Sequence, residues 1–349
     1  MDIESVSNLL SSPQKVVIVT HTAPDGDAIG SSLGLYHFLG AFGHTVRVIL
    51  PTELPEYLQF LPHSETALVY EKEPNECTML LEEAEILFVL DFNSATRAKG
   101  MEQLLPNLKA VKIMIDHHLL PEIKVDYALW DTQACSTAEL VYRFIERLGH
   151  KKQINHAVAS CLYTGICSDT GRFKYNINPD ALMIAAFLME RGASAEKIND
   201  ALFDNFSEQR LRLLGYCLTE KLQVFGQYCT AIIALSSTEL AQFNYKPGDL
   251  EGIVNYPLSL ANVRFSVLIK EDNKDVRLSF RSKGDFAVNE LASEHFSGGG
   301  HKNAAGGNSK LSLADTVQKL IRLLPAYERD LSAAALLISE PYQIGRAHV

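Results

Sequence analysis

The first half of the chain alternates short, continuous apolar runs with longer segments of helical spacing. The apolar runs at residues 15–21, 45–50, 86–91 and 111–116 are short and rich in β-branched residues, which indicates buried strands. Between the first two runs, residues 28–42 place apolar side chains at helical intervals. Because strands buried on both faces appear as unbroken apolar runs, this pattern predicts a parallel sheet flanked by helices.

The second half has a different pattern. Residues 228–235, 263–270 and 275–281 alternate apolar and polar positions or run β-branched, and the turn-like residues 271–274 join the last two segments. This pattern predicts a hairpin within a smaller α/β domain that contains a mixed sheet.

A chain of 349 residues is long for a single hydrophobic core, so we expect an α/β protein of two domains. We expect the active site in the cleft between them. The predicted parts are a first domain at 1–192, a helical linker region at 193–215 and a second domain at 216–340.

Composition restricts the class of partner. The net charge of −10 argues against a long duplex, because neutralisation of phosphates dominates the affinity of proteins for duplexes. A short anionic substrate held in a local pocket remains compatible. The six cysteines form no Cys-x-x-Cys pair, and no secretory signal or membrane-spanning run is present, so we expect a cytoplasmic protein without a membrane partner. A homodimer stays open.

Polar residues stand at the ends of three predicted strands, namely His21, Asp91 and Asp116. Ligands of open α/β sheets bind beyond the carboxyl ends of the strands. We therefore expect these three side chains to meet at one place.

The segment from His21 to Asp27 reads HTAPDGD and offers one imidazole and two carboxylates, those of Asp25 and Asp27. This donor set suits a hard divalent cation such as Mn²⁺. An alternative is purely structural, with Asp25 in a turn and Asp27 as the N-cap of the next helix.

Two further segments add donors. In Asp116-His117-His118 the adjacent imidazoles point in different directions, so one would bind metal and the other would face the substrate, while Asp116 could orient a histidine. Asp169 follows an apolar helix in a Ser-Asp-Thr-Gly turn. Each segment also has a structural alternative, as a surface histidine pair or as a turn. Together with Asp91 they supply enough donors for two cations bridged by one carboxylate.

These motifs, HxxxDxD, the strand-end aspartate, DHH and SDTG, resemble the DHH phosphoesterase family. The resemblance implies two divalent cations, Mn²⁺ first, with Mg²⁺ or Co²⁺ as alternatives, and it makes Asp91 the bridge. It implies catalytic roles for His118, near the phosphate, and for Asp116. The implied ligands of the first metal are His21, Asp25 and Asp91, and those of the second are Asp27, Asp91, His117 and Asp169.

The glycine run Gly298-Gly299-Gly300 before His301 resembles the signature of the DHH-associated domain of RecJ-like enzymes. Glycines allow close approach to a phosphate, and amides at the start of a following helix would favour an anion. A flexible loop is the alternative. The resemblance covers roughly residues 15–310, and the chain's size is that of the compact NrnA-type oligoribonuclease and pAp phosphatase branch. Family II pyrophosphatases carry a different second domain.

Substrate contacts are expected from the hairpin, where Arg264 and Arg281 fall on the polar face, predicted to be exposed. Guanidinium groups suit terminal phosphates, although solvated strand faces are an alternative. Phe173 and Tyr175 could stack a base or simply pack. Further candidates for substrate binding are Ser282, Asn303, Arg97 and Arg172.

The resemblance implies Mn²⁺-dependent hydrolysis of short oligoribonucleotides from an end, together with conversion of pAp to AMP. It makes residues 1–192 the metal-binding catalytic domain and residues 216–340 the substrate-binding domain. The expected partner is a short single-stranded RNA or DNA, or a mononucleotide bisphosphate. Alternatives are a phosphodiesterase for linear or cyclic dinucleotides, and a pyrophosphatase or exopolyphosphatase. A non-catalytic nucleotide-binding regulator is disfavoured, because no expected ligand position is substituted.

Overall fold

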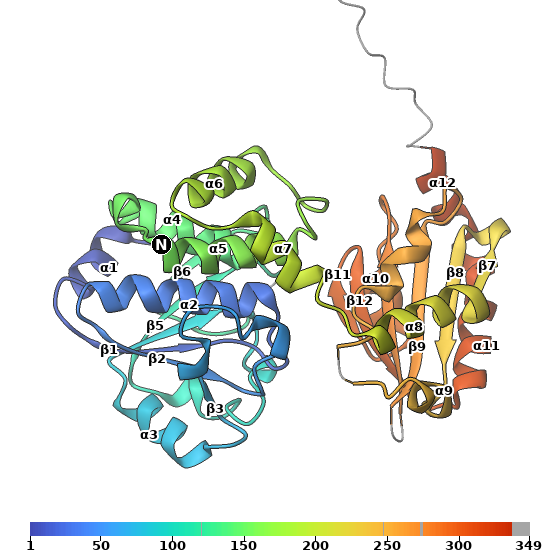
Figure 1. Cartoon of the computed structure of the whole chain (residues 1–349). Helices are drawn as coiled ribbons and strands as arrows, with labels where there is room; N and C mark the ends of the chain where they lie inside the picture. The colour runs from blue at the N-terminus through green and yellow to red at the C-terminus, as the bar shows by residue number, and fades with distance from the viewer. Residues whose placement is uncertain (120, 247, 273–274, 337–349) are drawn as a thin grey trace, which may run out of the picture. The chain divides into compact units, whose positions relative to one another are not determined.

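The computed structural model describes residues 1–119, 121–246, 248–272 and 275–336, which form two compact units (Figure 1). The N-terminal unit comprises residues 1–205, and the C-terminal unit begins at Phe206. This division falls inside the range 193–215 that the sequence predicts as a linker. Residue 340, the predicted end of the second domain, lies outside the described residues.

The N-terminal unit is built on a six-stranded sheet in which every pair of neighbours is parallel, in the order β3-β2-β1-β4-β5-β6. The chain moves outward from β1 in one direction and later in the other, so β1 and β4 flank a topological switch point. The strands are β1 (Lys15–Val19), β2 (Thr45–Leu50), β3 (Leu68–Val69), β4 (Ile86–Leu90), β5 (Val111–Asp116) and β6 (Tyr127–Trp130).

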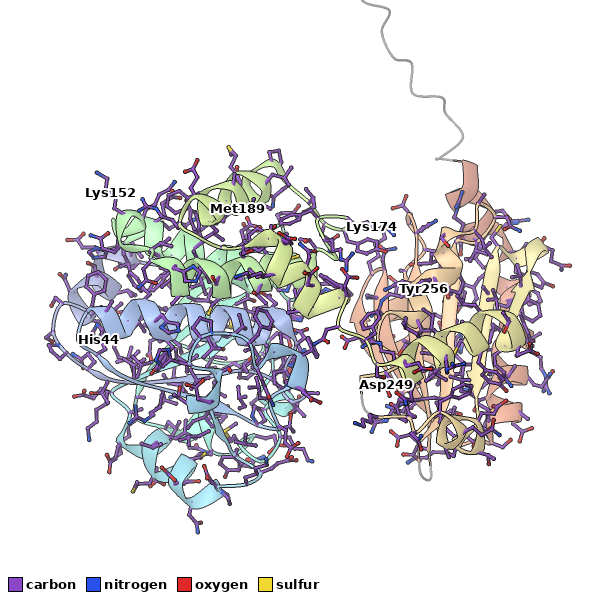
Figure 2. The ribbon with its side chains drawn as sticks, viewed as in Figure 1. His44, Lys152, Lys174, Met189, Asp249 and Tyr256 are labelled. Atoms are coloured by element: carbon purple, nitrogen blue, oxygen red, sulfur yellow. The ribbon has the colours of Figure 1, made fainter. Side chains whose placement is uncertain are left out.

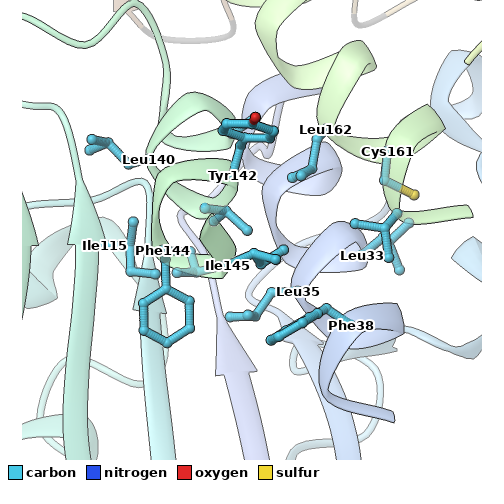
Figure 3. Close-up of a cluster of buried hydrophobic side chains, with 14 of the residues drawn as sticks. Leu33, Leu35, Phe38, Ile115, Leu140, Tyr142, Phe144, Ile145, Cys161 and Leu162 are labelled. Atoms are coloured by element: carbon cyan, nitrogen blue, oxygen red, sulfur yellow. The ribbon is translucent and has the colours of Figure 1, made fainter. Parts of the chain in front are cut away.

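Helices cover both faces of this sheet. Along β1, Ile18 packs on one face and Val17 on the other, and α3 covers the Val17 face (Figure 1). On the Ile18 face, Phe38 of α2 and Phe144 of α4 belong to one continuous apolar core with the sheet (Figure 3). The helices are α1 (Ile3–Leu9), α2 (Gly26–Ala41), α3 (Pro74–Glu83), α4 (Thr137–Arg147), α5 (His156–Asp169), α6 (Pro179–Glu190) and α7 (Ala195–Phe203).

Helices α2 and α5 are in unusually close contact, and glycine makes this possible. A Cβ atom at Gly30 would lie 2.5 Å from the Cys161 carbonyl oxygen. At Gly165 it would lie 2.8 Å from Asp27 Oδ1. This contact brings the beginning of α2 beside the last turn of α5, which ends at Asp169.

The C-terminal unit contains a mixed sheet in the order β11-β12-β10-β9-β8-β7, in which β8 and β9 are parallel and the other pairs antiparallel. The predicted α/β fold class, with a parallel sheet followed by a mixed one, is confirmed, as is the β9–β10 hairpin. The elements are α8 (Glu208–Tyr216), β7 (Leu222–Phe225), β8 (Thr230–Leu235), α9 (Ser237–Gln242), the 3-10 helix η8 (Ile253–Ser259), β9 (Phe265–Asp272), β10 (Asp275–Ser282), α10 (Val288–His295), β11 (Gly299–His301), β12 (Ala304–Ser309), α11 (Leu313–Leu323) and α12 (Glu328–Leu336).

The region 193–215, expected as a helical linker, is not one continuous helix. Helix α7 ends at Phe203 and α8 begins at Glu208. Ser207 starts the second helix as its N-cap, with a side chain that accepts from the Arg210 amide, so the chain is extended there rather than helical. The six cysteines are free, and among the described helices none has the length and apolar character needed to cross a membrane.

Candidate metal centre

The six predicted metal-ligand side chains gather beyond the carboxyl ends of the central strands. They form compact groups in which one ligand atom from each residue lies within 4.8 Å of the others. Asp91 and His117 each belong to two groups, so the groups are contiguous. The groups among the described residues are His21 with Asp25 and Asp91, Asp27 with His117 and Asp169, and Asp91 with His117 and His118.

Asp91 occupies the centre of this arrangement. Its Oδ2 lies 3.4 Å from His21 Nε2, and its Oδ1 lies 3.6 Å from His117 Nε2. The residue is only 2% exposed and has a φ of 66°, a left-handed conformation that is costly for most residues. The strained backbone directs the two carboxylate oxygens of one side chain toward two different imidazoles.

Asp25 and Asp27 do not occupy the turn and N-cap positions that the purely structural alternative gives them. Asp25 is the N-cap of α2, and its Oδ1 accepts from the Asp27 and Ala28 amides at 3.0 and 3.1 Å. The prediction of Asp27 as N-cap is wrong, because the extended residue that a cap requires is Asp25, with φ −101° and ψ −166°. Asp27 lies in the first turn and is fully buried.

The beginning of helix α4 holds two of these carboxylates. The amides of Thr137 and Ala138 donate to the two oxygens of Asp27 at 2.6 and 2.9 Å, where the positive end of the helix dipole favours negative charge. The Thr137 hydroxyl donates to Asp91 Oδ1 at 2.8 Å. Sequence reasoning missed this contribution, although Ser136, three residues before Glu139, is a recognisable helix start.

Two of the imidazoles present the same nitrogen to the centre. His21 Nδ1 lies 2.9 Å from the Thr22 carbonyl oxygen, and His117 Nδ1 lies 3.4 Å from that of Ala134. A carbonyl oxygen can only accept, so Nδ1 carries the proton in each ring. In the neutral rings Nε2 is then the unprotonated nitrogen, which can act as a metal ligand.

His118 is oriented by Asp116. Its Nδ1 lies 2.8 Å from Asp116 Oδ1, and the same nitrogen is 3.7 Å from Asp91 Oδ1. Asp116 is fully buried, and its Oδ2 accepts no hydrogen bond within the described part of the chain. The DHH aspartate therefore positions the second histidine of the motif.

The buried carboxylates repel one another. Burial and the charges of Asp91 and its neighbours raise the pKa of Asp27 well above its usual value, and burial and the charges of Asp25 and Asp91 do the same for Asp169. Burial opposes charge on Asp91 as well, but the hydrogen bond with His21 and the charges of His21, His118 and His117 together outweigh it and lower the pKa of Asp91. Burial likewise disfavours a charged His21, but the hydrogen bond with Asp91 and the charge of Asp91 raise the pKa of His21.

This donor set fits divalent cations. Four carboxylates and imidazole nitrogens without a thiolate suit Mn²⁺ or Mg²⁺ rather than a structural zinc. Cations would also relieve the repulsion that raises the pKa values of Asp27 and Asp169.

Of the two arginines predicted to contact phosphate in this unit, only Arg97 acts on the centre. Its positive charge partly opposes the rise in the pKa of both His21 and Asp169. Arg172 has other partners: its guanidinium lies 2.6 Å from Asp204 and stacks 4.6 Å from the centre of the Phe203 ring.

In the C-terminal unit, the prediction that Arg264 lies on an exposed face is wrong. Arg264 is 7% exposed, and the 3-10 helix η8, which includes the exposed Tyr256 (Figure 2), packs on β9 at Leu268. Its Nε has no hydrogen-bond partner in the described residues, and neither does the buried hydroxyl of Ser266. Arg281, half-buried, lies directly opposite Ser266 in the hairpin register. Buried donors without an acceptor are costly, so this cluster fits an anion.

The glycine run continues into a strand, not into the expected helix. Residues 299–301 form β11, and Cβ atoms at Gly298 and Gly300 would collide with the backbone of β12, so strand pairing requires these two glycines. Gly299 is exposed and has open space around its Cα, which leaves room for a phosphate. His301 is exposed beside it.

Ser282 and Asn303 already have structural partners. The Ser282 hydroxyl donates to the Phe286 carbonyl at 2.7 Å, and the Asn303 amide donates to Ser282 Oγ and to the Gly284 carbonyl at 2.8 and 2.9 Å. Both side chains stabilise the turn that follows β10.

Comparison with known proteins agrees with this arrangement. Residues 15–166 match the DHH family, N-terminal domain, and residues 225–328 match the DHHA1 domain. The chain is 30% identical to the bifunctional oligoribonuclease and PAP phosphatase NrnA of Thermus thermophilus, over 92% of each sequence. It is 26% identical to the protein of the same name from Bacillus subtilis, over 83% of this chain and 88% of the relative.

A solved structure is also similar: an exopolyphosphatase-related protein of Bacteroides fragilis is 40% identical, with a TM-score of 0.92, over 95% of this chain and 97% of that protein. The resemblance that the four motifs suggested is thus confirmed along nearly the whole chain. This chain belongs to the DHH family and carries a DHHA1 domain in its C-terminal unit.

Proposed function

We propose that this chain is a metal-dependent phosphoesterase that hydrolyses short oligoribonucleotides from an end and converts pAp to AMP. The observation that carries the proposal is the centre around Asp91, whose two oxygens face the imidazoles of His21 and His117. The substrates are those named for the Thermus thermophilus and Bacillus subtilis relatives, which match the chain over most of its length.

The metal ligands that we propose are the six side chains of the centre, with Mn²⁺ as the preferred cation. His21, Asp25 and Asp91 would hold one cation. Bound divalent cations supply an acidified water as nucleophile and neutralise charge on the phosphoryl oxygens. The second set of ligands would be Asp27, Asp91, His117 and Asp169.

His118 and Arg97 would act on the phosphate. Asp116 accepts from His118 Nδ1, so the imidazole is fixed, and when both ring nitrogens are protonated its Nε2 could donate a proton to the leaving oxygen and leave a neutral ring. Arg97, whose charge reaches His21 and Asp169, would stabilise negative charge on the phosphoryl group. Arg172 contributes less directly in this scheme, since Asp204 neutralises it.

In the C-terminal unit, Arg264, Arg281 and His301 would bind a terminal phosphate, with Gly299 allowing close approach of the backbone. The orphaned Nε of the buried Arg264 supports this role, because a phosphate would supply the acceptor that the described residues do not. Ser282 and Asn303 would support the site by holding the turn after β10. Gly298 and Gly300 would serve it by keeping β11 paired with β12.

The test is hydrolysis by the purified full-length protein with Mn²⁺, Mg²⁺ or Co²⁺. The substrates are pAp, the dinucleotide pApA, a five-nucleotide RNA, cyclic di-AMP, pyrophosphate and polyphosphate. Polyphosphate belongs in the series because of the Bacteroides fragilis structure's description. We expect pApA, the short RNA and pAp to be turned over fastest, with Mn²⁺. Dominant turnover of pyrophosphate or polyphosphate would overturn the proposed substrate.

A further inference from the structure

Trp130, the one tryptophan of the chain, lies beside the metal centre. It is the last residue of β6, the edge strand of the parallel sheet, and its backbone pairs with Asp116 of the DHH motif. It therefore stands at the same carboxyl edge of the sheet as the metal-ligand side chains. It is nevertheless 44% exposed, unusually open for the largest apolar side chain.

The indole ring is fixed in this position. Its Nε1–H donates to the His118 carbonyl oxygen at 2.6 Å, so the ring is tied to the residue whose Nδ1 lies 3.7 Å from Asp91. The loop after His118 is itself held, since Asn93 Nδ2 donates to the Leu119 carbonyl at 2.6 Å. An indole has a single donor, and this hydrogen bond satisfies it. What remains exposed is aromatic surface.

We propose that Trp130 is a stacking platform for a nucleobase of the substrate, on a nucleotide that adjoins the bond held at the metal centre. This inference rests on the proposed function. Every base offers a π-face, so a rigid aromatic ring binds short oligonucleotides without selecting sequence and without a net positive charge, which suits a chain whose net charge is −10. Of the stacking candidates from the sequence, Phe173 is engaged in packing, with its ring 5.7 Å from that of Tyr163.

Tryptophan fluorescence, excited selectively over that of the tyrosines, tests the platform directly, because the tryptophan emission of the full-length chain comes from Trp130 alone. The probe is a phosphorothioate-linked pApA, which resists hydrolysis, titrated in the presence of Mn²⁺. The comparison probe is the same sugar-phosphate backbone without bases. We expect saturable quenching by the first probe and no response to the second. Equal responses, or none to either, would overturn the platform.

Steady-state kinetics provide an independent readout. We expect Trp130→Ala to raise the KM for pApA about tenfold with little change in kcat, since stacking binds the base and not the reacting phosphate. Trp130→Phe should recover most of the affinity. Phe42→Ala is the matched control, because Phe42 is also exposed, at 39%, but lies at the opposite end of α2 from the metal ligands. An unchanged KM for Trp130→Ala, or an equal loss on the base-free backbone, would contradict the proposal.

The two readouts separate this inference from the proposed function. If the probe quenches the fluorescence but pApA is not hydrolysed, the proposed function is wrong and the stacking role of Trp130 is retained. If pApA is hydrolysed normally, but the probe causes no quenching and Trp130→Ala leaves the KM unchanged, the stacking role is wrong and the proposed function is retained. Loss of both signals in the wild-type protein would overturn both.

Discussion

Thr137 donates from its hydroxyl group to Oδ1 of Asp91 over 2.8 Å, and its backbone amide donates to Asp27 at 2.6 Å. One residue at the start of α4 thus fixes two carboxylates that come from the ends of different elements. Both hydrogen bonds are buried, where such contacts are strong and their loss is costly. The metal centre therefore depends on a helix that supplies none of its proposed ligands.

Thr137→Val should weaken metal binding while leaving the fold intact. The substitution keeps the shape of the side chain and the amide contact to Asp27, but it removes the donor to Asp91. Loss of a hydrogen bond that orients a ligand typically lowers metal affinity about 10- to 100-fold. Calorimetric titration with Mn²⁺ measures this change, and Thr137→Ser, which keeps the hydroxyl, should bind almost as the wild type does. Wild-type affinity in the valine variant would show that the contact does not position Asp91.

Two glycines of α2 should respond in opposite directions to substitution by alanine. At Gly30 the new Cβ would meet the Cys161 carbonyl at 2.5 Å, so Gly30→Ala should destabilise the N-terminal unit by about 1–3 kcal/mol. At Gly40 no atom lies within 4 Å, so Gly40→Ala should stabilise it by about 0.5–1 kcal/mol through helix propensity. Thermal unfolding of both variants checks the pair. Equal effects of the two changes would mean that the close contact of α2 and α5 is not tight.

The metal-free protein should lose stability as the pH rises. The pKa values of Asp27 and Asp169 are raised in the folded state, so the folded chain binds more protons than the unfolded chain above the usual value of 3.8. Stability from these two groups is then lost as the pH rises through their folded pKa values. Asp91, with a lowered pKa, contributes the opposite trend only at lower pH.

Divalent metal should reverse this trend, because cations replace the bound protons. Thermal melting in EDTA and in Mn²⁺, between about pH 5 and about pH 8, should show a metal-induced rise in Tm that grows with pH. Asp169→Asn should flatten the pH dependence in EDTA, because it removes one of the groups whose pKa is raised in the folded state, which also include Asp27 and His21. A metal effect that stays constant across this range would contradict the assignment.

Glu239 should be a main contributor to stability in the C-terminal unit. It completes a capping box with Ser236 and accepts from Lys221 and Tyr216, each at 2.7 Å. Burial opposes its charge, but these hydrogen bonds lower its pKa to about 2. Glu239→Gln should cost about 1–2 kcal/mol at neutral pH. The stabilisation by wild-type Glu239 should fade as the pH falls from 4.5 toward 2.

Glu208 offers a matched control for Glu239. It also pairs with a cation, Arg212, but both side chains are 70% exposed, and exposed pairs contribute little. Urea unfolding of Glu239→Gln and Glu208→Gln should show a clear loss for the first and almost none for the second. Similar losses would indicate that burial and capping add nothing at Glu239.

The positions of the strand-end residues could be predicted from the sequence because parallel strands place their carboxyl ends at one edge. The role of Asp25 as N-cap could not be predicted, because Asp25 and Asp27, separated by one residue, both fit an N-cap. Only the backbone angles show which of them is the cap. The burial of Arg264 could not be predicted either, because the strand pattern alone does not show that the polar face of β9 is covered, and η8 is a 3-10 segment without helical periodicity. Thr137 was missed because its partners are distant in sequence and its residue type suggests only a helix start.

The most direct test of the two-metal centre is an anomalous difference map from a crystal of the full-length protein grown with Mn²⁺. We expect two strong peaks, both within coordination distance of Asp91, one beside His21 and the other beside His117. A map with manganese bound elsewhere, or with no peak at Asp91, would contradict it.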